Sequence, residues 1–269
     1  MATIHRELAF AKLTRTLRVT GRRSDGYHLL ASEMVALDLA DEIWVDDSGT
    51  GLVLEDAIAW TGRGLDRPRL DVPLDGSNLV SRALELCGRS AAVRVVKRIP
   101  AGAGLGGGSA DAAAILRHFG GVEPATAASL GADVPFCVAG GRGLVSGIGE
   151  VIEPLSDVAL SFVIVTPAFP VSTKAVYDAY DELAPTTREG PNDLESAALV
   201  VEPRLADVRQ AIVAVARRSP TLAGSGASFF LECTASEQAD LAEALSASIA
   251  ELIGPAVVSA CRAVARRVS

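Results

Sequence analysis

The sequence predicts an α+β protein with two subdomains. Strand-like and helical segments are mixed along the chain without regular βαβ alternation, which is typical of this class. Apolar residues make up 49% and charged residues 22% of the chain, as in soluble globular proteins. The 269 residues suffice for two domains of ordinary size. A break at Glu153–Pro154 predicts an N-terminal domain of residues 1–153 and a C-terminal domain of residues 154–269.

In the first domain we expect strands at 13–21, 41–47 and 91–99 and helices at 77–88 and 109–119. Alternating apolar and polar residues predict the first strand. Asn78 or Ser77 can cap the helix that follows, because either side chain accepts from backbone N–H groups. The apolar residues of that helix recur on one face, namely Leu79, Val80, Ala83, Leu84 and Cys87. Residues 131–155 are expected to form a turn and then a hairpin, since glycines separate their short apolar runs.

In the second domain a buried strand is expected at 160–167. A helix carrying Val176, Tyr177 and Tyr180 follows it, and then an acidic, proline-bearing loop at 181–195. Further helices are expected at 205–215 and 237–252, with a turn and strand at 222–233 between them. This order of elements supports a mixed domain rather than a repeat.

Composition narrows the class of partner. The net charge of −8 and the pI of 5.0 argue against nucleic acid, which requires a basic surface. We expect no membrane span and no targeting segment, because the longest apolar stretch, 158–169, is short and interrupted. Four scattered cysteines without a CxxC motif predict reduced thiols and a cytoplasmic location, and no metal site built from protein ligands alone. Monomer and homodimer both stay open.

The stretch IPAGAGLGGGSADAAAIL, residues 99–116, is expected to bind phosphate. A strand, a glycine loop and a helix follow one another, so bare backbone N–H groups and the positive end of a helix dipole converge. No GK[ST] follows, which excludes a P-loop. Gly102, Gly104 and Gly107 match the dinucleotide spacing, but Pro100 and the lack of a βαβ unit weaken that alternative. No protein-kinase motifs accompany the loop, and a turn without ligand is the remaining alternative.

The string Pro100-x-x-x-Gly104-Leu105-Gly106-Gly107-Gly108-Ser109 resembles the central motif of the GHMP small-molecule kinases. Other segments resemble one branch of that family, which phosphorylates a cytidine diphosphate-linked methylerythritol in isoprenoid biosynthesis. These segments span nearly the whole chain in the order of the family: 11–12, 21–28, 77–83, 131–136, 171–177, 192–195 and 224–228. The resemblance implies a two-domain fold, with a ribosomal S5 domain 2-like N-terminal part and a ferredoxin-like C-terminal part.

The resemblance also implies roles. Asp133 would be the catalytic carboxylate and Lys12 its partner, with ATP and Mg²⁺ as cofactors. The nucleotide would be bound by Asn78, Lys97, Pro100, Gly102, Gly104, Leu105, Gly106, Gly107, Gly108 and Ser109. The cytidine-bearing substrate would be bound by Thr14, Tyr27, His28, Tyr177, Gly224, Ser225 and Gly226. The chemistry fits these residue types: a carboxylate accepts the hydroxyl proton, an ammonium group offsets phosphoryl charge, and aromatic faces suit a pyrimidine.

The chain departs from the family after Lys12. Thr14 and Arg15 stand where the family has asparagine and leucine. Strand alternation places Arg15 on the face of Leu13 and Leu17, so it must find a partner or reach solvent. Two alternatives therefore stay open: a GHMP kinase acting on another small alcohol, and a catalytically weak ATP-binding homologue.

Overall fold

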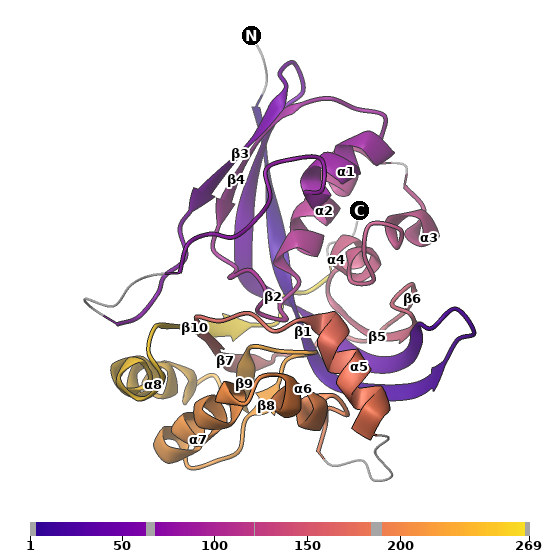
Figure 1. The fold of residues 1–269 in the computed structure, drawn as a ribbon. Helices are drawn as coiled ribbons and strands as arrows, with labels where there is room; N and C mark the ends of the chain where they lie inside the picture. Colours follow the sequence, from indigo (N-terminus) through magenta and orange to yellow (C-terminus); the bar gives the residue numbers. More distant parts are fainter. Residues whose placement is uncertain (1–3, 63–67, 121, 184–189, 267–269) are drawn as a thin grey trace.

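The structure is a computed structural model that describes residues 4–62, 68–120, 122–183 and 190–266. Its N-terminal half is built on a six-stranded sheet (Figure 1). The longest strands, β1 (Ile4–Arg22) and β2 (His28–Asp46), form an antiparallel pair. On the other edge of β2 lie β4 (Ala92–Lys97) and β5 (Arg142–Gly147), followed outward by β3 (Gly51–Asp56) and β6 (Val151–Pro154), in the order β3-β4-β2-β5-β6.

Besides the sheet, the described residues of the N-terminal half form four helices: α1 (Leu79–Leu86), α2 (Gly107–Phe119), α3 (Pro124–Ala127) and α4 (Val134–Ala139). The middle of helix α2, residues 110–116, is buried and carries Ala110, Ala112, Ala113 and Ala114. Such small side chains allow α2 to pack closely against β1, α1 and α4. The helix that follows the glycine loop is therefore held rigidly.

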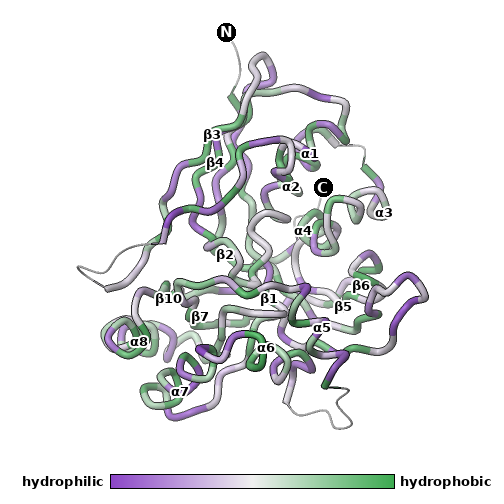
Figure 2. The backbone as a smooth tube through the Cα atoms, in the orientation of Figure 1, coloured by the Kyte–Doolittle hydropathy of each residue, from purple (hydrophilic) through white to green (hydrophobic). Residues whose placement is uncertain are grey.

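The C-terminal half is built on an antiparallel sheet with the order β10-β7-β9-β8. Its strands are β7 (Ser161–Pro167), β8 (Thr221–Leu222), β9 (Phe229–Cys233) and β10 (Ala256–Arg262). The helices are α5 (Thr173–Leu183), α6 (Glu195–Val201), α7 (Arg204–Ala216) and α8 (Gln238–Ile253). Hydrophilic and hydrophobic residues alternate along α7 and α8 (Figure 2), as expected for helices with one face on a sheet.

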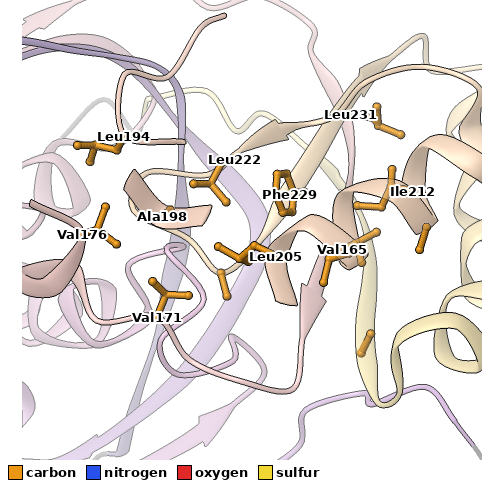
Figure 3. Packing of buried hydrophobic residues seen from close by; sticks show 14 of the residues in the cluster. Val165, Val171, Val176, Leu194, Ala198, Leu205, Ile212, Leu222, Phe229 and Leu231 are labelled. Atoms are coloured by element: carbon orange, nitrogen blue, oxygen red, sulfur yellow. The ribbon is translucent and has the colours of Figure 1, made fainter. Parts of the chain in front are cut away.

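The core of this half joins sheet and helices. Phe229 and Val165 from the sheet lie among Leu205, Ile212 and Val176 from the helices (Figure 3). The same cluster includes Leu17 and Val19 of β1. Strand β1 thus contributes to the hydrophobic cores of both halves. The chain passes from the first sheet to the second between β6 and β7, and the domain boundary that we propose at 153/154 falls inside the end of β6.

The predicted α+β class is confirmed, but several elements differ. The strands expected at 13–21 and 41–47 are parts of the longer β1 and β2. Residues 131–155 contain the expected hairpin, β5 and β6, but the first part is helix α4 rather than only a turn. Proline lies in the first turn of α4, where a missing N–H costs nothing. Strands β3 and β10 and helices α3 and α6 were not expected from the sequence. Residues 184–189 of the expected loop lie outside the described residues.

Arg15 finds its partners through a bulge. The pairing of β1 with β2 shifts register between Thr14 and Thr16, so strict alternation ends there. Arg15 forms an ion pair with Glu33 of β2, and its second terminal nitrogen lies 2.6 Å from Glu232 of β9. The arginine that alternation assigned to a core face therefore links the two sheets.

The helices in the described part of the chain include no candidate for a membrane-spanning segment.

Candidate active site

The glycine loop between β4 and α2 packs tightly against other parts of the chain. Gly104 has φ +76°, and a Cβ there would lie 2.4 Å from the carbonyl oxygen of Ala223. Gly106 has φ +69°, and a Cβ there would lie 2.8 Å from Cγ of Lys12. Both positions favour glycine through backbone conformation and through lack of space. The bare backbone therefore brings the loop against β1 and the C-terminal half.

Backbone hydrogen bonds hold the loop in this place. The N–H of Lys12 donates to the Leu105 carbonyl at 2.9 Å. From the C-terminal half, the N–H groups of Ala227 and Ser228 donate to the carbonyls of Gly102 and Ala103 at 3.3 and 3.1 Å. Since the loop carbonyls are used this way, the loop joins the two halves of the molecule.

Helix α2 begins directly at the loop. Its N-cap is Gly106, which offers no side-chain cap. The first N–H groups of a helix have no intrahelical partners, and the helix dipole places about half a positive charge there. The arrangement suits an anion such as a phosphate group at Gly107, Gly108 and Ser109.

Lys12 and Asp133 meet beside this helix start. The ammonium group of Lys12 lies 3.1 Å from Oδ2 of Asp133 and donates to Oγ1 of Thr14 at 3.2 Å. Asp133 occupies the N-cap position of α4 but makes no side-chain cap hydrogen bond. Its carboxylate is therefore free of the usual structural task of an N-cap aspartate. Lys12 is buried, and the side chain of Asp133 is 30% exposed.

Lys97 lies under the loop in a buried cluster. Its ammonium group contacts the carboxylates of Asp41 and Asp111, the latter at 2.6 Å. Burial opposes the charged ammonium form, but the two carboxylates outweigh this effect and raise the pKa of Lys97. Burial also raises the pKa of Asp111 to about 7. Lys97 was expected at the site from the sequence, whereas its pairing with Asp41 and Asp111 becomes visible only in the fold.

An aromatic group lies at the opposite end of the site. The ring of His28, at the start of β2, stacks on Tyr177 of α5 with centroids 4.8 Å apart and planes 22° apart. Nε2 of His28 donates to the carboxylate of Asp181 at 2.7 Å, and Arg22 pairs with the same carboxylate at 2.9 Å. Burial, and then the nearby Asp133 carboxylate, raise the pKa of Tyr177. Asp181 was missed because only the tertiary fold brings α5 to β2.

The turn at Gly224–Gly226 closes the site from the C-terminal half. Asn192 holds it by donating to the carbonyls of Leu222 and Gly224 at 2.8 and 2.7 Å. The hydroxyl of Ser225 lies 2.8 Å from that of Thr173 at the start of α5. A Cβ on Gly224 would lie 3.6 Å from the ammonium nitrogen of Lys12. The turn thus faces the Lys12–Asp133 pair.

These groups surround one cavity of about 990 Å³. Leu105 and Gly226 do not line it: Leu105 is buried in the core, and Gly226 faces Leu222 and Val171. Asn78 lines the cavity, but its side chain caps α1 by accepting from the N–H of Val80 at 2.8 Å. The remaining residues expected at the site also line the cavity, namely Lys12, Thr14, Tyr27, His28, Lys97, Pro100, Gly102, Gly104, Gly106, Gly107, Gly108, Ser109, Asp133, Tyr177, Gly224 and Ser225.

Known proteins share this fold and these segments. Residues 78–141 match the family model of the GHMP kinase N-terminal domain. Solved structures that are similar in fold include a homoserine kinase from Cytophaga hutchinsonii, with 18% identity, a TM-score of 0.58, and 96% and 95% of the two chains covered. The matched domain and the cavity around a glycine loop are those expected of a small-molecule kinase of this class.

Similarity in sequence narrows this class. The 4-diphosphocytidyl-2-C-methyl-D-erythritol kinase of Paracoccus denitrificans is 37% identical over 84% of this chain and 85% of the relative. The enzyme of the same name from Paramagnetospirillum magneticum is 36% identical over 82% and 86%. A crystal structure of 4-(cytidine 5'-diphospho)-2C-methyl-D-erythritol kinase is 32% identical, with a TM-score of 0.70 over 96% and 98% of the two chains. The chain therefore belongs to the GHMP kinases, in the family of 4-diphosphocytidyl-2-C-methyl-D-erythritol kinases.

Proposed function

We propose that this protein transfers the γ-phosphoryl group of ATP to the 2-hydroxyl of 4-diphosphocytidyl-2-C-methyl-D-erythritol, a step of non-mevalonate isoprenoid biosynthesis. One observation carries the proposal beside the family membership. The Lys12–Asp133 pair lies in a single cavity that the glycine loop and the His28–Tyr177 stack also line. A reacting hydroxyl held between the two ends would meet a carboxylate and an ammonium group.

The chemistry follows from this geometry. Asp133 accepts the proton of the attacking hydroxyl, since its carboxylate makes no cap hydrogen bond. Lys12 orients that carboxylate at 3.1 Å. Because the stem of Lys12 packs on Gly106, its ammonium group also lies beside the phosphate-binding helix start. There it stabilises negative charge on the transferring phosphoryl group.

The acceptor end fits a pyrimidine base. Stacked aromatic side chains present flat apolar faces, and the imidazole adds a polar edge that can donate or accept hydrogen bonds. Tyr27 also lines the cavity and is 61% exposed, so its ring is available to a bound base. We assign Tyr27, His28 and Tyr177 to recognition of the cytidine.

Mg²⁺ fits as a partner of the nucleotide rather than of the protein alone. The described residues contain no group of three His, Cys, Asp or Glu side chains that could hold a metal ion. Mg²⁺ commonly keeps phosphate and water ligands in kinases. When bound, it neutralises charge on the phosphate oxygens. We further propose that the enzyme acts in the cytoplasm, as a monomer or homodimer, without nucleic acid.

A coupled assay of ATP consumption tests the function. We expect turnover at about 1–100 s⁻¹ with the cytidine-bearing acceptor, as is usual for kinases, and background rates with homoserine, mevalonate or no acceptor. Turnover with one of those other alcohols would identify another GHMP acceptor. ATP binding without turnover on any acceptor would identify a catalytically weak homologue.

A further inference from the structure

A buried cluster of one lysine and two carboxylates lies beneath the glycine loop. Lys97 from β4 contacts Asp41 of β2 and Asp111 of α2, and the three side chains are 3%, 0% and 7% exposed. A Cβ on Gly107 would lie 3.4 Å from the ammonium nitrogen of Lys97. The ammonium group therefore lies directly against the first turn of α2, where the proposed function places the phosphates.

The two carboxylates differ in their hydrogen bonds. Asp41 accepts from the ammonium group of Lys97 and from the backbone N–H groups of Arg98 and Ile99. Asp111 accepts from Lys97 through Oδ2, whereas its buried Oδ1 has no hydrogen-bond partner among the described residues. Hydrogen bonds stabilise the ionised form of a carboxyl group. A proton entering the cluster is therefore expected on Asp111, the carboxyl group with the unpartnered oxygen.

Within the described part of the chain, the neighbouring elements supply no second cation to the cluster. On β1, Lys12 forms its ion pair with Asp133, which also lines the cavity. Helix α4 presents Cys137, a neutral thiol whose pKa burial raises to about 12. Arg82 of α1 donates to the carbonyl of Ser129. At the far end of α2, Arg117 donates to the carbonyls of Leu8 and Cys137. One ammonium group thus faces two carboxylates, and the fully ionised cluster carries one net negative charge.

We propose that Asp111 takes up a proton when a nucleotide binds at the glycine loop, so that the charge of Lys97 is freed to act on the phosphates. The inference rests on the proposed nucleotide site. Bound phosphate adds negative charge beside the cluster, and like charges disfavour a second ionised carboxylate. The proton leaves a buffer acid in solution and forms an O–H bond on the Asp111 carboxyl group. Asp111 is thereby a positioning residue, since it acts through Lys97.

The pKa of Asp111 lies in the range where such proton uptake can occur. Burial raises the pKa of Asp111 to about 7, so near neutral pH the free protein holds a mixture of both forms. Added phosphate charge moves the pKa further upward. Because the bound state then holds more protons, nucleotide affinity falls as the pH rises through this range.

Isothermal titration of wild type and Asp111→Asn with MgADP at pH 7.5 tests the proposal. The slope of binding enthalpy against buffer ionisation enthalpy gives the protons taken up. We expect an uptake of about half a proton more in wild type than in Asp111→Asn, from the linkage of binding to a group titrating near pH 7. The ionisation of the ligand contributes equally to both proteins. Asp47→Asn, whose carboxylate pairs with His118 outside the cavity, should match wild type.

The outcomes separate the two proposals. Failure of wild type to bind MgADP would remove the proposed function. Tight binding with equal slopes in wild type and Asp111→Asn would overturn the inference and leave the kinase intact. If Asp111→Asn does not fold, difference infrared spectra of wild type test whether a carboxyl group becomes protonated when the nucleotide binds. Addition of MgADP should produce the carbonyl band of a protonated carboxylic acid, and its absence overturns the inference.

Discussion

The two ends of the cavity are built in different ways. The nucleotide end comes largely from one continuous segment, residues 97–111, and depends on backbone N–H groups, glycines and a helix start. The acceptor end is assembled from side chains on β1, the start of β2, α5 and the turn at 224–226. The nucleotide end is therefore a local structure that a short stretch of sequence specifies. The acceptor end exists only when the two halves of the molecule pack together.

The catalytic pair joins the two ends and should give the largest effect when changed. In Asp133→Asn the amide cannot accept the hydroxyl proton, so we expect kcat to fall by about 10²–10⁴-fold. ATP affinity should stay close to that of wild type, because the phosphate-binding backbone is untouched. Steady-state kinetics and nucleotide titration measure the two quantities. A variant with full kcat would show that Asp133 is not the base.

The nucleotide end should be sensitive to a single added methyl group at one glycine and tolerant at another. In Gly104→Ala the Cβ would clash with the Ala223 carbonyl at 2.4 Å, and φ is positive. We expect a loss of stability of about 1–3 kcal/mol from such strain and weaker ATP binding. In Gly108→Ala the Cβ would meet Leu79 at 3.5 Å within a helix, so stability should not fall.

Urea unfolding of both variants measures this difference. Equal destabilisation of Gly104→Ala and Gly108→Ala would mean that the close approach of the loop to the C-terminal half is not what requires glycine. A loss confined to Gly104→Ala would support the role of the loop as the junction between the halves.

The contrast also explains what the sequence could predict. The loop, the helix after it and the pair Lys12–Asp133 follow from motifs whose residues are close in sequence or resemble a family. Asp41, Asp111 and Asp181 were missed because their partners come from other elements. The bulge at Arg15 was missed because period-two alternation assumes an unbroken ladder. A turn was expected in place of α4, because glycines flank this six-residue helix and it is too short to show periodicity.

The acceptor end should respond in KM more than in kcat. His28→Ala removes the ring that stacks on Tyr177. A contact between an aromatic side chain and a bound base is worth about 0.5–1.5 kcal/mol. Its loss should raise KM for the cytidine-bearing acceptor about 3–10-fold and leave KM for ATP unchanged. His118→Ala is the matched control, since His118 also pairs with an aspartate but lies outside the cavity. An equal rise in KM for ATP would contradict the assignment of His28 to the acceptor end of the cavity.

The smallest effect should come from Arg15, which lies outside the main cavity and links the two sheets. Arg15→Ala leaves Glu232 without this partner, whereas Glu33 keeps Arg142 at 2.7 Å. A partly exposed ion pair is worth about 1 kcal/mol or less, so the free energy of unfolding should fall by about that amount, and less in high salt. The exposed pair of Arg6 with Glu42 gives the comparison: Arg6→Ala should change stability by less.

Activity should stay within about twofold of wild type in Arg15→Ala, because stability changes of this size leave nearly all the protein folded. A large change in acceptor KM would instead make the departure at Arg15 part of acceptor recognition, and the acceptor end would then extend to the junction of the two sheets.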